Sequence, residues 1–170
     1  MTKKVYRILG VDTSLRSSGV GIIEAVGGLQ NAVAYGRILN RPAELHSDCL
    51  WNIFEEVSSL IKTHKPDCAA IEGAFFSKNA KTAMVLGQAR GAVLAACAQS
   101  KVPVYEHTPR RVKQALTGNG GAQKDQVAKM VKQILKLDEQ PQEDAADALA
   151  IAITHFHQLN LPEALRAPQI

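Results

Sequence analysis

Residues 5–39 read VYRILGVDTSLRSSGVGIIEAVGGLQNAVAYGRIL and contain three apolar, loosely alternating runs that are typical of β-strands. The runs cover residues 5–11, 19–25 and 29–39. Gly27 and Gly28 separate the second run from the third, and a Gly-Gly pair favours a tight turn. Because strands joined by such short links pair with their neighbours, this segment predicts an antiparallel meander of three strands.

Helical and strand-like segments alternate after residue 40. Helical periodicity or an alanine-rich composition marks residues 50–61, 79–100, 109–116, 127–135 and 141–157. Short apolar strands are expected at residues 67–72 and 102–106. The whole pattern predicts an α/β fold: a mixed five-stranded sheet, with three antiparallel meander strands plus two parallel strands, flanked by helices.

The length of 170 residues suits one domain, which we place at residues 1–158, with a flexible C-terminal tail at residues 159–170. Hydrophobic residues make up 46% of the chain and charged residues 21%, a composition that excludes a disordered protein. The three cysteines are widely spaced and fit neither a disulfide framework nor a zinc site. No segment is apolar enough for a signal peptide or a membrane span, so we expect a cytoplasmic protein without a membrane partner.

The charges are distributed unevenly along a chain whose net charge is +4. Residues 101–136 contain eight Lys or Arg residues and two acids, whereas residues 137–170 contain six acids and one Arg. A basic segment followed by an acidic one suits a surface that holds phosphates beside a surface that holds metal ions. Two solvated helix faces that differ in charge explain the same pattern, and charge alone favours this second interpretation.

Four acids occupy places where a carboxylate is costly. Asp12 ends the first predicted strand and Glu72 ends the fourth, at the strand ends where open sheets bind ligands. Asp144 and Asp147 are three residues apart on one face of a predicted helix whose neighbouring alanines suit close packing. Carboxylates that converge repel one another, and a hard divalent cation such as magnesium or manganese removes that repulsion.

Two of these acids also have local explanations. Asp12 suits a turn before Thr13 and Ser14, and Asp144 suits the first turn of a helix, where the helix dipole favours negative charge. Neither explanation covers Glu72, which follows an apolar strand, or Asp147, which lies deeper in an apolar helix.

Three runs extend this pattern: AIEGAFFSKNAKTAMVLGQARG from residue 70, RRVKQALTGNGGAQKDQVAKMV from residue 110 and QEDAADALAIAITH from residue 142. Together they resemble the RuvC family of Holliday junction resolvases, and the resemblance covers residues 8–157. It implies a ribonuclease H-like fold and a homodimer that cuts four-way DNA junctions with magnesium. By matching position, the catalytic and metal-binding acids are Asp12, Glu72, Asp144 and Asp147. The family usually has Asp-Pro-Gly where this chain has Asp12, Thr13 and Ser14.

The resemblance also implies which residues contact DNA. Lys113 and Lys124 match basic positions near the DNA backbone, and Arg110 and Arg111 are weaker candidates. Phe75 is expected to stack on an unpaired base, although packing in the core is the alternative. Two magnesium ions, which manganese can replace, would share Asp12 as a ligand. Cleavage of the DNA would then leave 5′-phosphate and 3′-hydroxyl ends. A branch-migration helicase complex is the expected partner.

Three other functions remain open at this point. A ribonuclease H-like nuclease that processes RNA would need the same metal site. A scaffold that binds junctions without cutting them is disfavoured, because clustered acids facing phosphate weaken binding. A sugar-kinase-like ATPase shares the acid at the end of the first strand but is disfavoured by the short chain and by the helix with Asp144 and Asp147. Glu143, beside this pair, has no assigned role.

Overall fold

The computed structural model describes residues 4–73 and 79–170. Within these ranges the strands are β1 (Val5–Asp12), β2 (Ser17–Val26), β3 (Leu29–Leu39), β4 (Cys68–Glu72) and β5 (Val104–His107). The helices are α1 (His46–His64), α2 (Ala80–Gln99), α3 (Pro109–Thr117), α4 (Lys124–Ile134) and α5 (Glu143–Leu159), followed by a 3₁₀ turn, η1 (Glu163–Leu165). The sheet order is β3-β2-β1-β4-β5, antiparallel from β3 to β1 and parallel from β1 to β5. This arrangement confirms the predicted mixed sheet.

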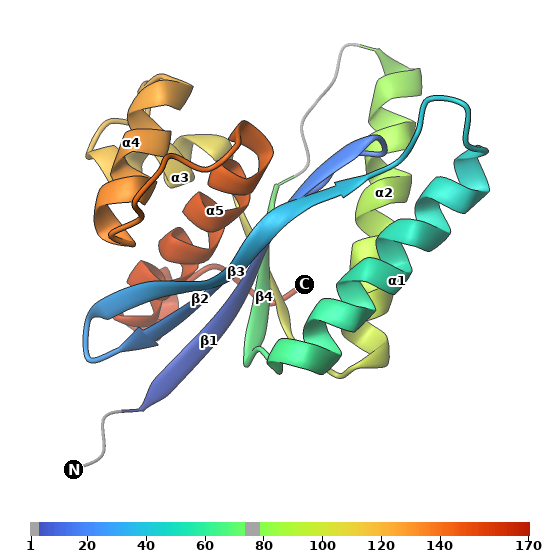
Figure 1. The fold of residues 1–170 in the computed structure, drawn as a ribbon. Coiled ribbons are helices and arrows are strands. Elements are labelled where there is room, and N and C mark those ends of the chain that lie inside the picture. Colours follow the sequence, from blue (N-terminus) through green and yellow to red (C-terminus); the bar gives the residue numbers. More distant parts are fainter. Residues whose placement is uncertain (1–3, 74–78) are drawn as a thin grey trace.

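Helices cover both faces of the sheet: α1 and α2 lie on one face, and α3, α4 and α5 lie on the other (Figure 1). Successive side chains of a strand point to opposite faces, so each strand contributes to two cores. Ile8 and Ile23 pack in the cluster that contains the α5 residues, whereas Leu9 and Ile22 pack against α1 and α2. The strands are therefore apolar on both sides, as their near-continuous hydrophobic runs predict.

Helix α5 lies directly on the sheet because glycines in β1 and β2 leave room for its backbone. A Cβ atom on Gly10 would overlap the carbonyl oxygen of Ala148, and one on Gly19 would overlap that of Asp144. Ala145 and Ala148 are buried at this contact. The expected close packing of the alanine-rich helix against the sheet is confirmed. This packing places the first turn of α5 beside the end of β1.

Several element boundaries differ from those expected, and for two of them a local hydrogen bond gives the reason. Strand β5 begins two residues later, since the N–H of Val102 donates to the carbonyl of Cys97 (2.9 Å) and completes the end of α2. Helix α4 begins three residues earlier, where the N–H of Gln123 donates to Oε1 of Gln126 (2.9 Å).

The end of residues 161–170, a segment expected within a flexible tail, pairs with β5. Gln169 forms an antiparallel bridge with Tyr105, and the N–H of Ile170 donates to the carbonyl of Val104 (3.0 Å). Strand β5 is an edge strand, so its outer main-chain groups are available for such pairing. The segment thereby covers one edge of the sheet.

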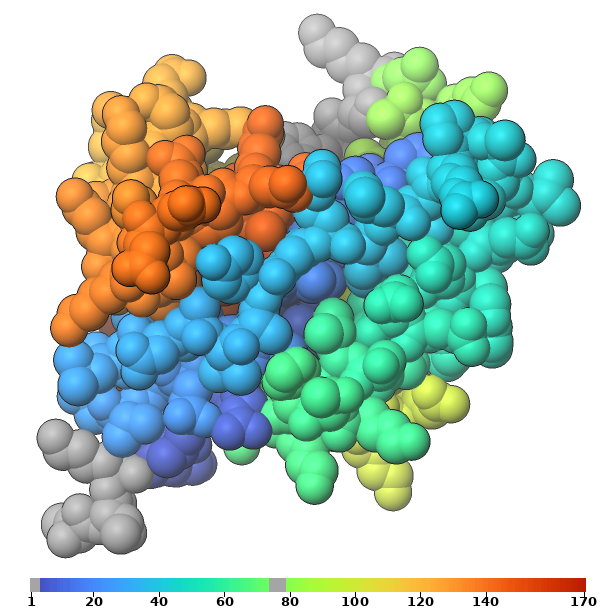
Figure 2. All heavy atoms as spheres, in the orientation of Figure 1, coloured from blue at the N-terminus to red at the C-terminus, as the bar shows by residue number. Residues whose placement is uncertain are grey.

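The face shown in Figure 2 is crossed by β3, in blue to cyan, between the orange α4–α5 segment and the green α1 region. Every second residue of β3 is exposed, including Leu29, Val33 and Tyr35. Among the described residues, no helix combines the length and the apolar character that a membrane crossing requires.

Candidate active site

The ends of β1 and β4 bring Asp12 and Glu72 to the same edge of the sheet. Val11 pairs with Ile71 in the parallel ladder, so the next residue of each strand is one of these acids. Gly19 lies opposite Asp12 on β2 and contacts the start of α5. Three elements far apart in the sequence therefore meet at this edge, as the positions of the acids predicted.

A cavity of about 270 Å³, here called the carboxylate cavity, opens at this edge. Asp12, Glu72 and Asp147 line it together with Lys113 and Lys124, and most of the remaining lining is apolar. The structure thus brings three of the four predicted acids, and both predicted lysines, to one cavity.

The fourth acid, Asp144, accepts a short hydrogen bond from the hydroxyl of Ser17 at the start of β2. Its charge still raises the pKa of Asp12. Asp144 therefore lies near the cavity with its carboxylate held by β2.

The acids in the carboxylate cavity hold their protons more tightly than ordinary carboxyls. Burial is the main cause that raises the pKa of Asp12 to about 7, and the charge of Glu72 adds most to it. Burial also raises the pKa of Glu72 and of Asp147. The ammonium of Lys124 opposes all three shifts. Negative charge at this site is therefore costly without a cation.

Lys124, the first residue of α4, supplies part of the missing positive charge. Its Nζ lies 2.6 Å from Oε1 of Glu143 and 3.5 Å from Oδ2 of Asp147. Glu143, whose role the sequence left open, is thus the main partner of this lysine. The hydrogen bond with Glu143 is the largest cause of the raised pKa of Lys124, which stays charged.

Arg90 of α2 supports the end of β4 from the opposite face of the sheet. Its Nη1 donates to the carbonyl of Glu72 (2.9 Å), and its Nη2 forms a short ion pair with Glu106 of β5. The guanidinium thus joins the ends of two neighbouring strands behind the cavity. Sequence reasoning missed this residue, although an arginine in a helix of mostly small and apolar residues was a signal.

The family model for the crossover junction endodeoxyribonuclease RuvC matches residues 8–155. Crossover junction endodeoxyribonuclease RuvC from Alkalilimnicola ehrlichii is 43% identical over 160 residues, which cover 94% of this chain and 96% of that protein. The protein of the same name from Brevibacillus brevis is 46% identical over 153 residues, 88% of this chain and 90% of that protein. The chain belongs to the RuvC family.

The fold agrees with a solved RuvC structure. Thermus thermophilus RuvC in complex with a Holliday junction substrate superimposes with a TM-score of 0.89 at 33% identity, covering 97% of this chain and 99% of that chain. The ribonuclease H-like fold expected for a RuvC chain is therefore confirmed.

The donor set of this RuvC chain suits a hard divalent cation, because the predicted ligands offer carboxylate oxygens only. Burial and, after it, the neighbouring carboxylates raise the pKa of Asp12, and a bound cation would favour its charged form. In the part of the chain that the structure describes, no three Asp, Glu, His or Cys side chains are grouped as a metal centre. Instead, Lys124 and Ser17 hold Asp147 and Asp144.

The turn after Asp12, where this chain departs from the RuvC pattern, is closed by Ser18. The N–H of Ser14 donates to Oγ of Ser18 (3.0 Å), and the same hydroxyl donates back to the carbonyl of Ser14. The hydroxyl of Ser18 thus holds the main chain of this turn.

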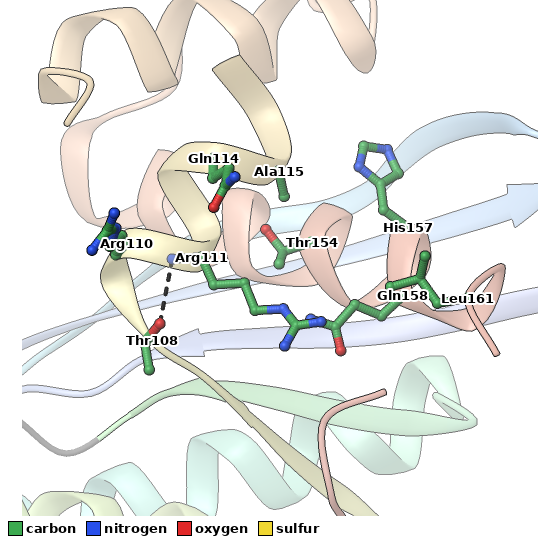
Figure 3. Close-up of a pocket in the computed structure, with 9 residues that line it drawn as sticks. All are labelled: Thr108, Arg110, Arg111, Gln114, Ala115, Thr154, His157, Gln158 and Leu161. Carbon is green, nitrogen blue, oxygen red and sulfur yellow. Dashed lines mark hydrogen bonds between the residues drawn. The ribbon is translucent and has the colours of Figure 1, made fainter. Parts of the chain in front are cut away.

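The other predicted DNA contacts have different surroundings. Arg110 packs beside Gly120, and Nη2 of Arg111 donates to the carbonyl of Leu165 (3.0 Å) in the C-terminal segment. Both arginines line a second cavity of about 520 Å³ between α3 and α5 (Figure 3). Phe75, predicted to stack on a base of the RuvC substrate, lies outside the described residues.

Proposed function

We propose that this protein is a Holliday junction resolvase, which nicks four-way DNA junctions symmetrically during homologous recombination and DNA repair. The observation that carries the proposal is the carboxylate cavity, where Asp12, Glu72 and Asp147 meet Lys113 and Lys124. Family membership supports the same activity, because the relatives are named crossover junction endodeoxyribonucleases. Hydrolysis would give 5′-phosphate and 3′-hydroxyl ends, which a ligase can rejoin.

The four acids Asp12, Glu72, Asp144 and Asp147 would hold two Mg²⁺ ions, or Mn²⁺ in their place. We assign Asp12 as the shared ligand, Glu72 to one ion and the pair from α5 to the other. When bound, the ions supply charge neutralisation at the phosphate and activation of the attacking water. The acids of the cavity are partly buried, which strengthens the electrostatic interactions inside it.

The two lysines of the cavity would bind the DNA backbone. Lys113 and Lys124 extend from α3 and α4 toward the acids and would contact phosphates on either side of the cut. When Lys124 engages a phosphate, Asp147 loses its partner and becomes free to act as a ligand. Arg110 and Arg111 are secondary phosphate contacts, and Phe75 would stack on an unpaired base at the junction centre.

Paired, symmetric cuts require two active sites, so we propose that residues 1–158 form the nuclease unit of a homodimer. A branch-migration helicase complex is the proposed partner, and the cytoplasm is the proposed location.

A cleavage assay with three substrates tests the proposal. A four-way junction should be nicked with Mg²⁺ and left intact without it, whereas a linear duplex and an RNA–DNA hybrid of the same sequence should survive. Asp12→Asn should abolish nicking and retain junction binding in Ca²⁺. Preferred cleavage of the hybrid would replace the proposal with an RNA-processing function, and turnover by the Asp12 variant would reject the assigned site.

A further inference from the structure

A chain of buried side chains connects the C-terminal segment to the end of β5. Gln158 and His155 of α5 and His107 of β5 are each at most 4% exposed. Nε2 of Gln158 lies 3.2 Å from Nδ1 of His107, and Nε2 of His107 lies 3.1 Å from Nδ1 of His155. At the other end, the N–H of Ala167 donates to Oε1 of Gln158 (2.8 Å).

The contact with Ala167 sets the donor and the acceptor in each hydrogen bond that links Gln158, His107 and His155. Because Oε1 of Gln158 accepts from the main chain, its amide nitrogen is left to donate to Nδ1 of His107. A neutral imidazole has one donor and one acceptor, so Nε2 of His107 carries the proton and donates to His155. Burial lowers the pKa of His107 to about 3 and that of His155 to about 4, which keeps both rings neutral.

His107 lies beside the proposed active site. It pairs with Glu72 in the parallel ladder, and its carbonyl accepts from the N–H of Gly73 (2.8 Å). The next residue, Thr108, caps α3 by accepting from the N–H of Arg111 (3.3 Å), and α3 carries Lys113 to the carboxylate cavity. Groups that fix His107 therefore also fix Glu72 and the start of α3.

A second contact holds the C-terminal segment in place. Arg111 extends from α3 toward Gln158, in the last turn of α5, and Leu161, just after it (Figure 3). Its Nη2 donates to the carbonyl of Leu165. The segment is thus anchored to α5 through Gln158 and to α3 through Arg111.

We propose that Gln158 is a positioning residue: Ala167 orients its amide, and the amide in turn fixes His107 beside Glu72. This inference rests on the proposed junction-cleaving function. In this arrangement the C-terminal segment acts on catalysis through Gln158 and His107.

Two variants test the inference from opposite sides of the same hydrogen bond. Gln158→Met keeps the length of the side chain and removes the amide, whereas Ala167→Pro keeps the amide and removes the N–H that orients it. Arg166→Ala is the matched control, because the side chain of Arg166 donates to the carbonyl of Leu161 (2.9 Å) and not to Gln158, His107 or His155. For each protein we would record the imidazole ¹⁵N spectrum and the kcat, KM and Kd for a four-way junction.

We expect the wild type and Arg166→Ala to show His107 protonated at Nε2 alone, and the other two variants to lose this single tautomer. Both should cleave with a kcat about tenfold lower at unchanged Kd, because small displacements of catalytic groups reduce rates strongly. Wild-type kcat in a variant with an altered imidazole spectrum would overturn the positioning role, as would an unaltered spectrum in both variants. The spectrum needs no DNA, so a wild type that fails to cleave counts against the proposed function alone.

Discussion

Lys124 and Asp147 form an ion pair at the carboxylate cavity, with Nζ of the lysine 3.5 Å from Oδ2 of the aspartate. The same nitrogen is closer to Oε1 of Glu143, at 2.6 Å. A residue that the sequence suggests as a phosphate contact is thus also the cation that partly balances the buried acids. Its side chain is exposed, so under the proposed function a phosphate that binds Lys124 would release Asp147.

Replacing Lys124 by Met should raise the pKa of Asp12 above its value of about 7. The lysine favours the charged carboxylate, so its removal makes deprotonation harder. A ¹³C carboxyl titration of the metal-free protein measures this shift. Lys129→Met is the matched control, since Lys129 is equally exposed and pairs with Asp125 on the same helix (3.5 Å). A pKa of Asp12 that stays constant or falls would contradict the electrostatic role of Lys124.

Replacing Asp12 by Asn should stabilise the metal-free protein in a pH-dependent way. The pKa of Asp12 is raised from 3.8 to about 7 on folding, so the wild type loses stability relative to the variant as the pH rises between these values. The difference in melting temperature should be absent below pH 3.8, grow up to pH 7 and stay constant above it. Thermal melts from pH 3 to pH 9 measure it. A variant that melts below the wild type at pH 8 would show that the acid stabilises the fold.

Magnesium should stabilise the wild type and leave Asp12→Asn unchanged. A cation that binds only the folded state adds about 2.7 kcal/mol to the free energy of unfolding at 100 times its Kd. Melting curves with increasing MgCl₂ measure the shift. Glu139→Gln, in the exposed loop before α5, should respond like the wild type. An equal shift in the Asp12 variant would place the magnesium elsewhere.

Replacing Gly19 by Ala should push α5 away from the sheet and reduce both stability and cleavage. The added methyl group would overlap the carbonyl of Asp144, and overpacking of this kind typically costs about 1–3 kcal/mol. Denaturant melts and the cleavage assay measure the two effects. Gly36→Ala, in β3, is the control because its Cβ would meet no atom within 4 Å. Equal stability of the two variants would be inconsistent with the close contact between α5 and β2.

Replacing Arg90 by Met should lower kcat about tenfold while junction binding is retained. The variant loses the hydrogen bond to the carbonyl of Glu72 and the ion pair with Glu106, so the end of β4 is less well positioned. Single-turnover cleavage and a binding titration separate the two quantities. Lys81→Met, an exposed position on the same helix, should behave like the wild type. A loss of binding with unchanged single-turnover rate would assign Arg90 to DNA contact.

The order of elements and the location of the acids at strand ends could be predicted from local patterns. Alternation identified the meander, and helical spacing placed Asp144 and Asp147 on one face of α5. These features depend on residues within a few positions of each other, so the sequence displays them directly. The alanines of α5 likewise indicated close packing against the sheet, which Gly10 and Gly19 make possible.

The partners of each charged group were decided only by the tertiary structure. Three such contacts join residues that lie in different elements or segments. They are the ion pair of Lys124 with Glu143, the hydrogen bond of Arg90 to the carbonyl of Glu72 and the hydrogen bond of Ala167 to Gln158. The spacing of residues along the sequence does not predict such contacts, because they depend on strand register and on the placement of helices across the whole sheet. Local sequence therefore determined which residues are costly to bury, whereas long-range packing decided which neighbours compensate that cost.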